Sequence, residues 1–207
     1  MIIAIDGPAA AGKGTLAKRL AAALGLPYLD TGLLYRATAK RVLVAGANPA
    51  DEQAALHAAQ SLTQADFERP DLRDTETSKA ASQVASLPAV RHALLEFQRR
   101  FGGQHGAVLD GRDIGTIIFP NADVKLFVTA SVEARAQRRW LEFQTRGETV
   151  PLAEVIADVA ARDEADRTRA AAPLIQAPDA TLIDTTHLTA DEAFARALEI
   201  VQTRQPV

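Results

Sequence analysis

The stretch GPAAAGKGT, residues 7–15, decides the fold. Before it lies the apolar run MIIAI at residues 1–5, which is typical of a strand buried on both faces. After it, Leu16, Leu20 and Leu24 recur on one face of a predicted helix over residues 13–24. A glycine-rich loop between a buried strand and a helix is the context of a P-loop, in which backbone N–H groups and the positive helix N-terminus hold phosphates.

One position of this loop departs from the common P-loop pattern. Gly14 follows Lys13 where most P-loops carry a serine or threonine, and Thr15 comes only after it. Because Thr15 is turned about a third of a helical turn from that position, direct ligation of Mg²⁺ by its hydroxyl stays an open question. The motif Gly-Lys-Gly-Thr is typical of small-molecule kinases. The sequence contains no Asn-Lys pair that would recognise guanine, which disfavours a GTPase switch. The alternative to a P-loop is a glycine-rich turn that binds no phosphate.

Outward from the loop, strand-like runs alternate with helical patterns. This alternation predicts one α/β domain, in which a parallel sheet carries helices on both faces. Residues 61–82 are polar and lack a clean period, so we interpret them as an insert on this scaffold. The predicted strands cover residues 1–5, 27–29, 107–110, 124–129 and 181–184. The predicted helices cover residues 13–24, 33–45, 88–100, 131–146 and 150–169, with another from Asn48-Pro49 to residue 60 and a last one opened by a capping box at residues 189–192.

Composition excludes several classes of protein. The 207 residues contain no cysteine, which rules out disulfides, a thiolate nucleophile and cysteine-ligated metals. A net charge of −3 gives no pull toward nucleic acid or an anionic membrane. No apolar run reaches the length of about 20 residues that a membrane span needs, so cytoplasmic residence is the default expectation. The basic residues are 18 Arg and only 5 Lys, which reflects either codon bias or a need for forked phosphate ligands.

The first polar cluster that follows a predicted strand contains Asp30, Thr31 and Arg36. Ligands of open α/β sheets gather at the carboxyl ends of strands, and this cluster would lie there, near the P-loop. The alternatives are a helix cap for Asp30 or Thr31 and a solvated surface charge for Arg36.

The second cluster contains Asp110, Arg112 and Asp113, directly after the strand at residues 107–110. An acidic residue at the end of a strand beside the P-loop strand commonly holds Mg²⁺, often through water, and Asp110 fits that role. A turn without a ligand is the alternative.

The third cluster lies on the helix predicted over residues 150–169. Arg162, Asp166 and Arg169 are spaced to share one face of it, and Arg135, Arg138 and Arg139 lie upstream. Spaced opposite charges usually form a solvated, salt-bridged face, which is one interpretation. A helical lid that closes over phosphates is the other.

Taken together, the segments IDGPAAAGKGTLAKRLA, YLDTGLLYRA, KAASQVASLPAVRHALLEFQR, LDGRDIGTIIFPNADVKLFVTAS, RDEADRTRAAAPL and DTTHLT resemble the cytidylate kinases of bacteria, members of the nucleoside monophosphate kinase family of P-loop proteins. The resemblance implies a parallel five-stranded sheet flanked by helices, with a small acceptor-binding insert at about residues 60–86 and a helical lid at about residues 135–169, all within one domain over residues 1–207. It implies transfer of the γ-phosphoryl group of ATP to CMP and dCMP, with Mg²⁺.

The same resemblance implies roles for individual residues. Catalysis would rest on Lys13, Arg112 and Asp110, with Asp110 touching Mg²⁺ through water and Thr15 as a second metal candidate. The cytosine edge would be recognised by Ser82, Arg91 and Asp113, the ribose by Arg162 and Asp166, and the acceptor phosphate by Thr31, Arg36, Arg112 and Arg169. ATP would be bound by Gly7, Pro8, Ala9, Ala10, Ala11, Gly12, Lys13, Gly14 and Thr15, together with the lid residues Arg135 and Arg138 or Arg139.

The chemistry of cytosine agrees with these roles. Cytosine offers an amino donor and two acceptors, so a carboxylate with a hydroxyl and an arginine would distinguish it from uracil. The insert departs from many relatives, because residues 61–79 show no alternating strand pair. Arg73 within it is either an acceptor contact or a surface residue.

Two rival functions stay open at this stage. One is a kinase of the same architecture with another small acceptor, such as UMP or shikimate; the other is a nucleotide-binding switch without transfer activity. We expect small-molecule partners only, no nucleic acid or membrane, and a monomer. Trp140 is expected to pack its helix.

Overall fold

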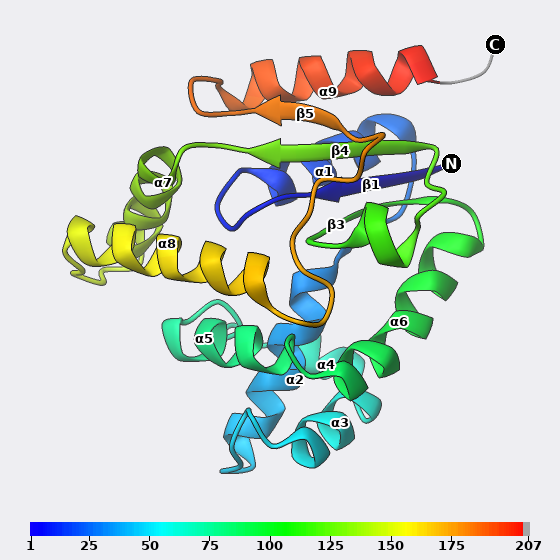
Figure 1. The fold of residues 1–207 in the computed structure, drawn as a ribbon. Helices are drawn as coiled ribbons and strands as arrows, with labels where there is room; N and C mark the ends of the chain where they lie inside the picture. The colour runs from blue at the N-terminus through cyan, green and yellow to red at the C-terminus, as the bar shows by residue number, and fades with distance from the viewer. Residues whose placement is uncertain (205–207) are drawn as a thin grey trace.

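The computed structural model describes residues 1–204, which form one parallel sheet wrapped by helices (Figure 1). The strands lie in the order β2-β3-β1-β4-β5, and every neighbouring pair is parallel, as the sequence predicts. Their bounds are β1 (Ile2–Asp6), β2 (Tyr28–Asp30), β3 (Ala107–Gly111), β4 (Val124–Thr129) and β5 (Thr181–Asp184). Since β1 is central, the P-loop that follows it emerges at the middle of the carboxyl edge.

The two faces of the sheet bury different elements because side chains alternate along each strand. Ile3 and Ile5 of β1 belong to a core cluster with residues of α1 (Lys13–Leu24) and α9 (Ala190–Arg204). Ala4 points to the other face, where it packs with Leu109, with the short π-helical turn η1 (Ile114–Ile118) and with α6 (Pro88–Gly103). Burial on both faces explains the near-continuous apolar runs of β1 and β3.

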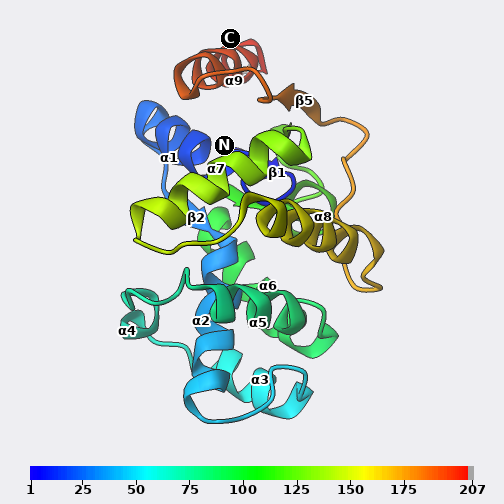
Figure 2. The same cartoon turned by 90° about the vertical axis from the view of Figure 1, so that its left-hand side faces the viewer.

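Below the sheet, α2 carries a helical subdomain (Figure 2). The helix α2 (Thr31–Val44) packs against α3 (Glu52–Gln60), α4 (Gln64–Phe67) and α5 (Thr75–Val84), and α3 also contacts α6. Its core is built mainly from alanines and other small apolar side chains. Tight helix packing follows, and it places α5 below the carboxyl edge of the sheet (Figure 1).

Two further helices lie at the same carboxyl edge of the sheet, between it and α5 (Figure 1). They are α7 (Val132–Thr145) and α8 (Leu152–Thr168), which bury Phe143, Val155 and Val159 between them. Trp140 joins this small core and its Nε1 donates to Val150 O at 3.0 Å, which confirms that it packs its helix. Helix α8 contacts α5 across the edge, so the two helical parts face each other there (Figure 1).

Two expectations about helices are wrong. Asn48-Pro49 does not start α3, because the Asn48 side chain accepts from Ala50 N in a local turn and Asp51 caps the helix by accepting from Gln53 N and Ala54 N. Residues 61–82 are also more regular than their pattern indicated. A capping box at Thr63 holds the short α4, and α5 buries small or polar side chains such as Thr77 and Ala80, which give no visible apolar period.

The remaining boundaries agree with the prediction within a few residues. Strands β4 and β5 and helix α1 begin and end where expected. The capping box at the start of α9 is present, since Glu192 N donates to Thr189 Oγ1 while the Glu192 carboxylate accepts from Thr189 N. Within residues 1–204, no helix combines the length and the apolar character that crossing a membrane requires.

Candidate active site

The P-loop is held against β4 by a glycine that no other residue can replace without movement. Gly7 has φ +146°, and a Cβ built on it would lie 1.9 Å from Val128 O. The loop ends at Gly12, whose φ of +88° turns the chain into α1. These two positions therefore fix where the backbone N–H groups of the loop lie.

Lys13 is buried at the centre of this loop, with 5% of its surface exposed. Its ammonium group donates to Pro8 O at 2.7 Å. Burial lowers its pKa, the positive charge of Arg112 lowers it further, and the carboxylate of Asp110 opposes both. A phosphate in the loop would supply the negative charge that this ammonium lacks.

A tyrosine occupies the space beside Gly14. The hydroxyl of Tyr28, at the start of β2, donates to Asp110 Oδ1 at 2.8 Å. A Cβ at Gly14 would lie 3.6 Å from that hydroxyl and 3.8 Å from Asp110 Oδ2. Burial raises the pKa of Tyr28, and the charge of Asp110 raises it further, so the hydroxyl stays protonated and acts as the donor.

Arg112 joins the end of β3 to helix α8. Its Nε donates to Asp166 Oδ2 at 2.7 Å, and Arg169 Nη1 lies 3.6 Å from Asp166 Oδ1. Asp166 is 6% exposed, so the interpretation of this helix face as solvated is wrong. The structure therefore brings Arg112 into one charged cluster with Asp166 and Arg169, which lie 54 and 57 positions further along the chain.

Guanidinium groups crowd together around this cluster. Burial lowers the pKa of Arg36 to about 9, and the nearby charges of Arg162, Arg73 and Arg139 lower it further. Burial and the charge of Arg112 lower the pKa of Arg162 to about 10. Both groups still carry their charge at neutral pH.

Two donors in this crowd have no acceptor among residues 1–204. They are Arg162 Nε and Arg169 Nη2, and both atoms are buried. Arg36 Nη1 donates to Leu72 O at 3.2 Å and to the Ser78 hydroxyl at 2.6 Å. Buried donors without partners are costly, and an anion between these side chains would satisfy them.

The residues expected at the cytosine edge are only partly together. Arg91 of α6 forms a buried ion pair with Asp113, and its guanidinium lies 5.5 Å from the centre of the Tyr35 ring. Ser82 of α5 directs its hydroxyl back along its own helix to Ser78 O, at 3.4 Å. Thr31 donates to Asp110 O at 2.7 Å, so its hydroxyl would have to rotate to reach a phosphate.

On the other side of the P-loop lies a cavity of about 200 Å³. Thr15 lines it, together with Leu16 of α1, Arg138 of α7 and Leu188 and Thr189 beyond β5. Arg138 donates to both the hydroxyl and the carbonyl of Thr185, which itself donates to Ala11 O in the loop at 3.0 Å. Thr15 thus faces this cavity.

Two arginines, one in α7 and one directly after it, connect this helix to the rest of the site. Arg135 is fully ion-paired to Asp163 of α8 and donates to Ala9 O of the P-loop at 3.2 Å. Arg146, after α7, donates to Arg73 O at 3.0 Å, and Arg73 pairs with Asp30 at 2.9 Å. Helix α7 and the residue after it therefore contact both the P-loop and the segment before α5.

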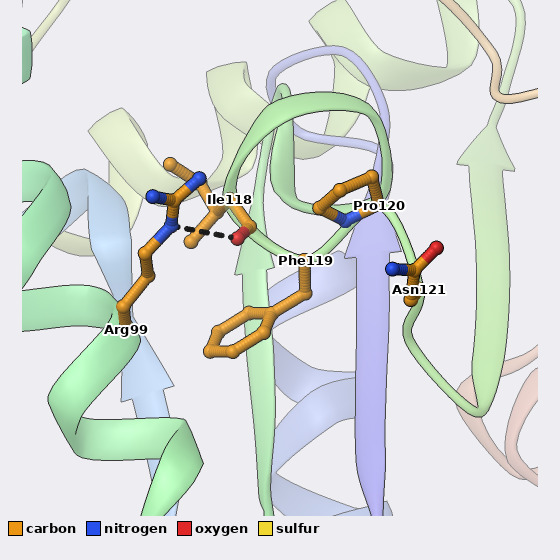
Figure 3. A pocket seen from close by; sticks show the side chains of 5 residues that line it. All are labelled: Arg99, Ile118, Phe119, Pro120 and Asn121. Carbon is orange, nitrogen blue, oxygen red and sulfur yellow. Dashed lines mark hydrogen bonds between the residues drawn. The ribbon is translucent and has the colours of Figure 1, made fainter.

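A larger cavity, of about 320 Å³, lies elsewhere (Figure 3). Arg99, Ile118, Phe119, Pro120 and Asn121 line it, and Arg99 donates to Ile118 O at 3.2 Å. It precedes β4, at the amino end of the sheet, whereas the P-loop and the arginine cluster lie at the carboxyl end. The larger cavity is therefore separate from the candidate active site.

Sequence reasoning missed several residues that shape the site. Asp6 ends β1, and its carboxylate accepts from Ile114 N at 2.8 Å and Gly115 N at 2.7 Å, which fixes the turn after Asp113. Burial raises the pKa of Asp6 to about 6, against the effect of these bonds. The signal for Asp6 was its place just before the loop, and the signal for Asp163 was its place beside Arg162. Nothing in the sequence marked Tyr28.

Metal binding depends on few protein ligands here. Within residues 1–204, no three His, Cys, Asp or Glu side chains converge as a metal site. Asp110 has one carboxylate oxygen engaged by Tyr28, while the other faces the Gly14 position. This arrangement fits a Mg²⁺ ion held chiefly by nucleotide phosphates and water, with one carboxylate nearby.

Comparisons with known proteins agree with the fold and show the family of the chain. The family model described as cytidylate kinase matches residues 3–203. A cytidylate kinase of Acidiphilium cryptum is 63% identical over 97% of this chain and 95% of its own length, and one of Granulibacter bethesdensis is 58% identical over 100% and 99%. Among solved structures, a protein of Thermus thermophilus superposes with a TM-score of 0.52 at 22% identity, covering 100% of this chain and 98% of its own, and supports the fold alone.

Proposed function

The chain belongs to the cytidylate kinase family, and we propose how its residues perform the reaction of that family. It transfers the γ-phosphoryl group of ATP to CMP or dCMP and releases ADP with CDP or dCDP. The residue assignments rest on one observation. Several arginines lie close together, and two of them, Arg162 and Arg169, have buried donors without a partner among residues 1–204. A phosphate dianion has the charge and the acceptor oxygens that these donors lack.

We assign the phosphate of CMP to this cluster. Arg36, Arg112 and Arg169 would hold its oxygens, and Thr31 would add a hydroxyl after rotating away from Asp110 O. Arg162 and Asp166 would bind the ribose hydroxyls beside them. This assignment relieves the mutual repulsion that lowers the pKa of Arg36 and Arg162.

Cytosine is assigned to the pocket that contains the Arg91–Asp113 pair. Asp113 would accept from the amino group, Arg91 would donate to the ring acceptors, and Ser82 would turn from Ser78 O toward the base. The support is the burial of Asp113, which is 5% exposed. Uracil would set a carbonyl against this carboxylate and leave buried acceptors unmatched.

ATP is assigned to the P-loop and to the cavity beside it. The backbone of residues 7–15 and Lys13 would surround the phosphates, while the cavity lined by Leu16, Arg138 and Leu188 would hold the base. Arg135 is too fully paired with Asp163 to bind ATP as the structure stands, so we give it the role of anchoring the lid to the loop.

We propose Mg²⁺ as the metal, with Asp110 touching it through water and Thr15 outside its reach. When bound, the ion neutralises charge on the phosphate oxygens. The protein's own part is alignment: Lys13 and Arg112 stand at the boundary between the two nucleotides and neutralise the transferred group. The acceptor is already a dianion, so no strong general base is needed, and closure of α7 and α8 would exclude water.

The location and assembly of the protein are also proposals. Its substrates, CMP and ATP, favour the cytoplasm. Exposed large apolar residues such as Val44, Phe97 and Leu141 lie on different helices, and this scatter favours a monomer. Size-exclusion chromatography with light scattering checks the latter.

A coupled assay of ADP release with CMP, dCMP, UMP, AMP and shikimate tests the function. We expect turnover with CMP and dCMP, weak turnover with UMP and none with shikimate. Activity confined to an acceptor without cytosine would overturn the assignment. Tight ATP binding without turnover on any acceptor would instead support a nucleotide-binding switch.

A further inference from the structure

We propose that Tyr28 is a positioning residue of the phosphate site, whose hydroxyl takes the place left open by Gly14 and holds the Asp110 carboxylate toward the nucleotide phosphates. The proposal rests on the function proposed above for Asp110. It answers the question that the sequence raised, namely what replaces the hydroxyl that most P-loops carry directly after their lysine.

The first step is the space beside Gly14. A side chain at this position would begin 3.6 Å from the Tyr28 hydroxyl and 3.8 Å from Asp110 Oδ2. Both are ordinary contact distances, so the volume is open to a small side chain but bordered by two oxygens. A serine or threonine hydroxyl of a common P-loop would point into the volume that the tyrosine hydroxyl borders here.

The second step is the hydrogen bond. Tyr28 donates to Asp110 Oδ1 at 2.8 Å and leaves Oδ2 on the side of Gly14. Residues 28 and 108 are register partners on β2 and β3, and Asp110 lies two residues further along β3 on the same face. A side chain as long as tyrosine is needed to span that offset, which explains why a shorter hydroxyl residue at position 28 would not serve.

The third step excludes the neighbouring hydroxyl. Thr15 lines the cavity with Arg138 and Leu188, on the other side of α1's first turn from Asp110. Thr31, the other hydroxyl near β3, is directed to the Asp110 carbonyl oxygen rather than to its carboxylate. Among residues 1–204, Tyr28 is thus the side chain that holds the Asp110 carboxylate by a hydrogen bond.

The experiment measures ATP affinity by calorimetry with and without Mg²⁺. The test variant is Tyr28→Phe, which keeps the ring that packs against the core cluster and removes only the hydroxyl. We expect metal-free ATP to bind as in the wild type, while the gain in affinity on adding Mg²⁺ falls about tenfold, the usual scale for losing a group that orients a metal-site carboxylate. Equal loss with and without Mg²⁺, or no loss at all, overturns the proposal.

A second-site variant tests whether the two hydroxyls share one place. Gly14→Ser in the Tyr28→Phe background puts a P-loop hydroxyl into the volume that the tyrosine vacates. We expect it to restore most of the Mg²⁺-dependent gain, whereas Gly14→Ser alone gives no gain over the wild type. A double variant as defective as Tyr28→Phe overturns the shared position.

Asp110→Asn separates this proposal from the one on which it rests. If this variant keeps the full Mg²⁺-dependent gain, the role of Asp110 is wrong and the role of Tyr28 fails with it. If Asp110→Asn loses the gain while Tyr28→Phe keeps it, Asp110 stands and the proposal for Tyr28 alone is overturned. Thermal unfolding of each variant shows whether the fold is retained.

Discussion

Arg112 and Asp166 meet across 2.7 Å, although one follows the strand β3 and the other lies near the end of the lid helix α8. Asp166 is buried and Arg112 is partly buried, and the pair would join the proposed acceptor-phosphate and ribose sites. The Asp166 carboxylate also lies 3.6 Å from Arg169 Nη1. Loss of this single carboxylate would leave several guanidinium groups facing one another.

Replacing Asp166 with Asn therefore weakens acceptor binding. We expect the KM for CMP to rise at least tenfold, since a hydrogen bond between charged groups contributes about 1.5–3 kcal/mol. The KM for ATP should change little. Steady-state kinetics with each substrate varied in turn checks this, and Asp158→Asn, at an exposed position of the same helix, is the matched control. An unchanged KM for CMP would contradict the assignment.

The same variant reveals a pH dependence of stability. Burial opposes ionisation of Asp166, but Arg112, Arg162 and Arg169 outweigh it and hold its pKa below the usual value. A carboxyl whose pKa is lower in the folded protein stabilises it above the unfolded pKa, about 4, and this stabilisation is lost as the pH falls through the folded value. At pH 7 we expect the free energy of unfolding of the wild type to exceed that of Asp166→Asn by about 3 kcal/mol.

That difference should shrink steadily below about pH 4. Urea unfolding of both proteins between pH 7 and pH 2.5 measures it. A difference that stays constant down to pH 2.5 would show that the ion pair is not its source.

Base discrimination depends on Asp113. Asp113→Asn replaces an acceptor with an amide that also donates, so uracil is no longer opposed by a carboxylate. We expect the ratio of kcat/KM for CMP over UMP to fall about tenfold or more, because a mismatched buried polar pair costs about 1–3 kcal/mol. Glu96→Gln, exposed on the helix that carries Arg91, should leave the ratio unchanged. An unaltered ratio in Asp113→Asn would remove this residue from base recognition.

The framework was predictable because its signals are local. Strand β4, strand β5 and helix α1 follow from apolar runs and from the P-loop, and a parallel sheet follows from their alternation. The subdomain around α5 was not predictable in this way. Its buried residues, such as Thr77 and Ala81, are small or polar, and so they carry almost no hydrophobic period.

The residues of the candidate site also differ in whether a local sequence signal marks them. Lys13, Asp110 and Arg112 lie beside strand ends, where a motif or a charge cluster is visible in the sequence. Tyr28 becomes a functional candidate only through its contact with Asp110, 82 residues away, and no local pattern encodes such a contact. The sequence offers for Asp163 only its place beside Arg162, and its partner Arg135 lies 28 residues away. The Arg excess gains a partial explanation, because many arginines gather in one cleft.

Two neighbouring arginines of α7 should affect different substrates. Arg138 lies in the cavity beside the P-loop and donates to Thr185, whereas Arg139 is close enough to Arg36 and Arg162 to lower their pKa values. We expect Arg138→Met to raise the KM for ATP and Arg139→Met to raise the KM for CMP, each about fivefold, which corresponds to about 1 kcal/mol, the scale of one typical hydrogen bond. Both variants raising the same KM would refute this division. Either variant is the control for the other.

We expect Arg162 to lower the stability of the ligand-free protein and to strengthen the binding of CMP. Its Nε has no acceptor among residues 1–204, and its pKa falls to about 10 because of burial and of repulsion by Arg112 and Arg139. Arg162→Met keeps the apolar stem of the side chain and removes this charge, so we expect the ligand-free protein to gain about 1 kcal/mol in its free energy of unfolding. The KM for CMP should rise about tenfold at the same time, because the ribose and phosphate lose a donor.

Urea unfolding without nucleotide and steady-state kinetics measure the two effects on one preparation. Arg167→Met is the matched control, since that side chain lies on the same helix, is 63% exposed and, among residues 1–204, pairs with Glu164 alone. The control should change neither quantity. If Arg162→Met instead destabilises the ligand-free protein, the guanidinium has an acceptor in solution, and the repulsion inferred for the arginine cluster is not the force that CMP relieves.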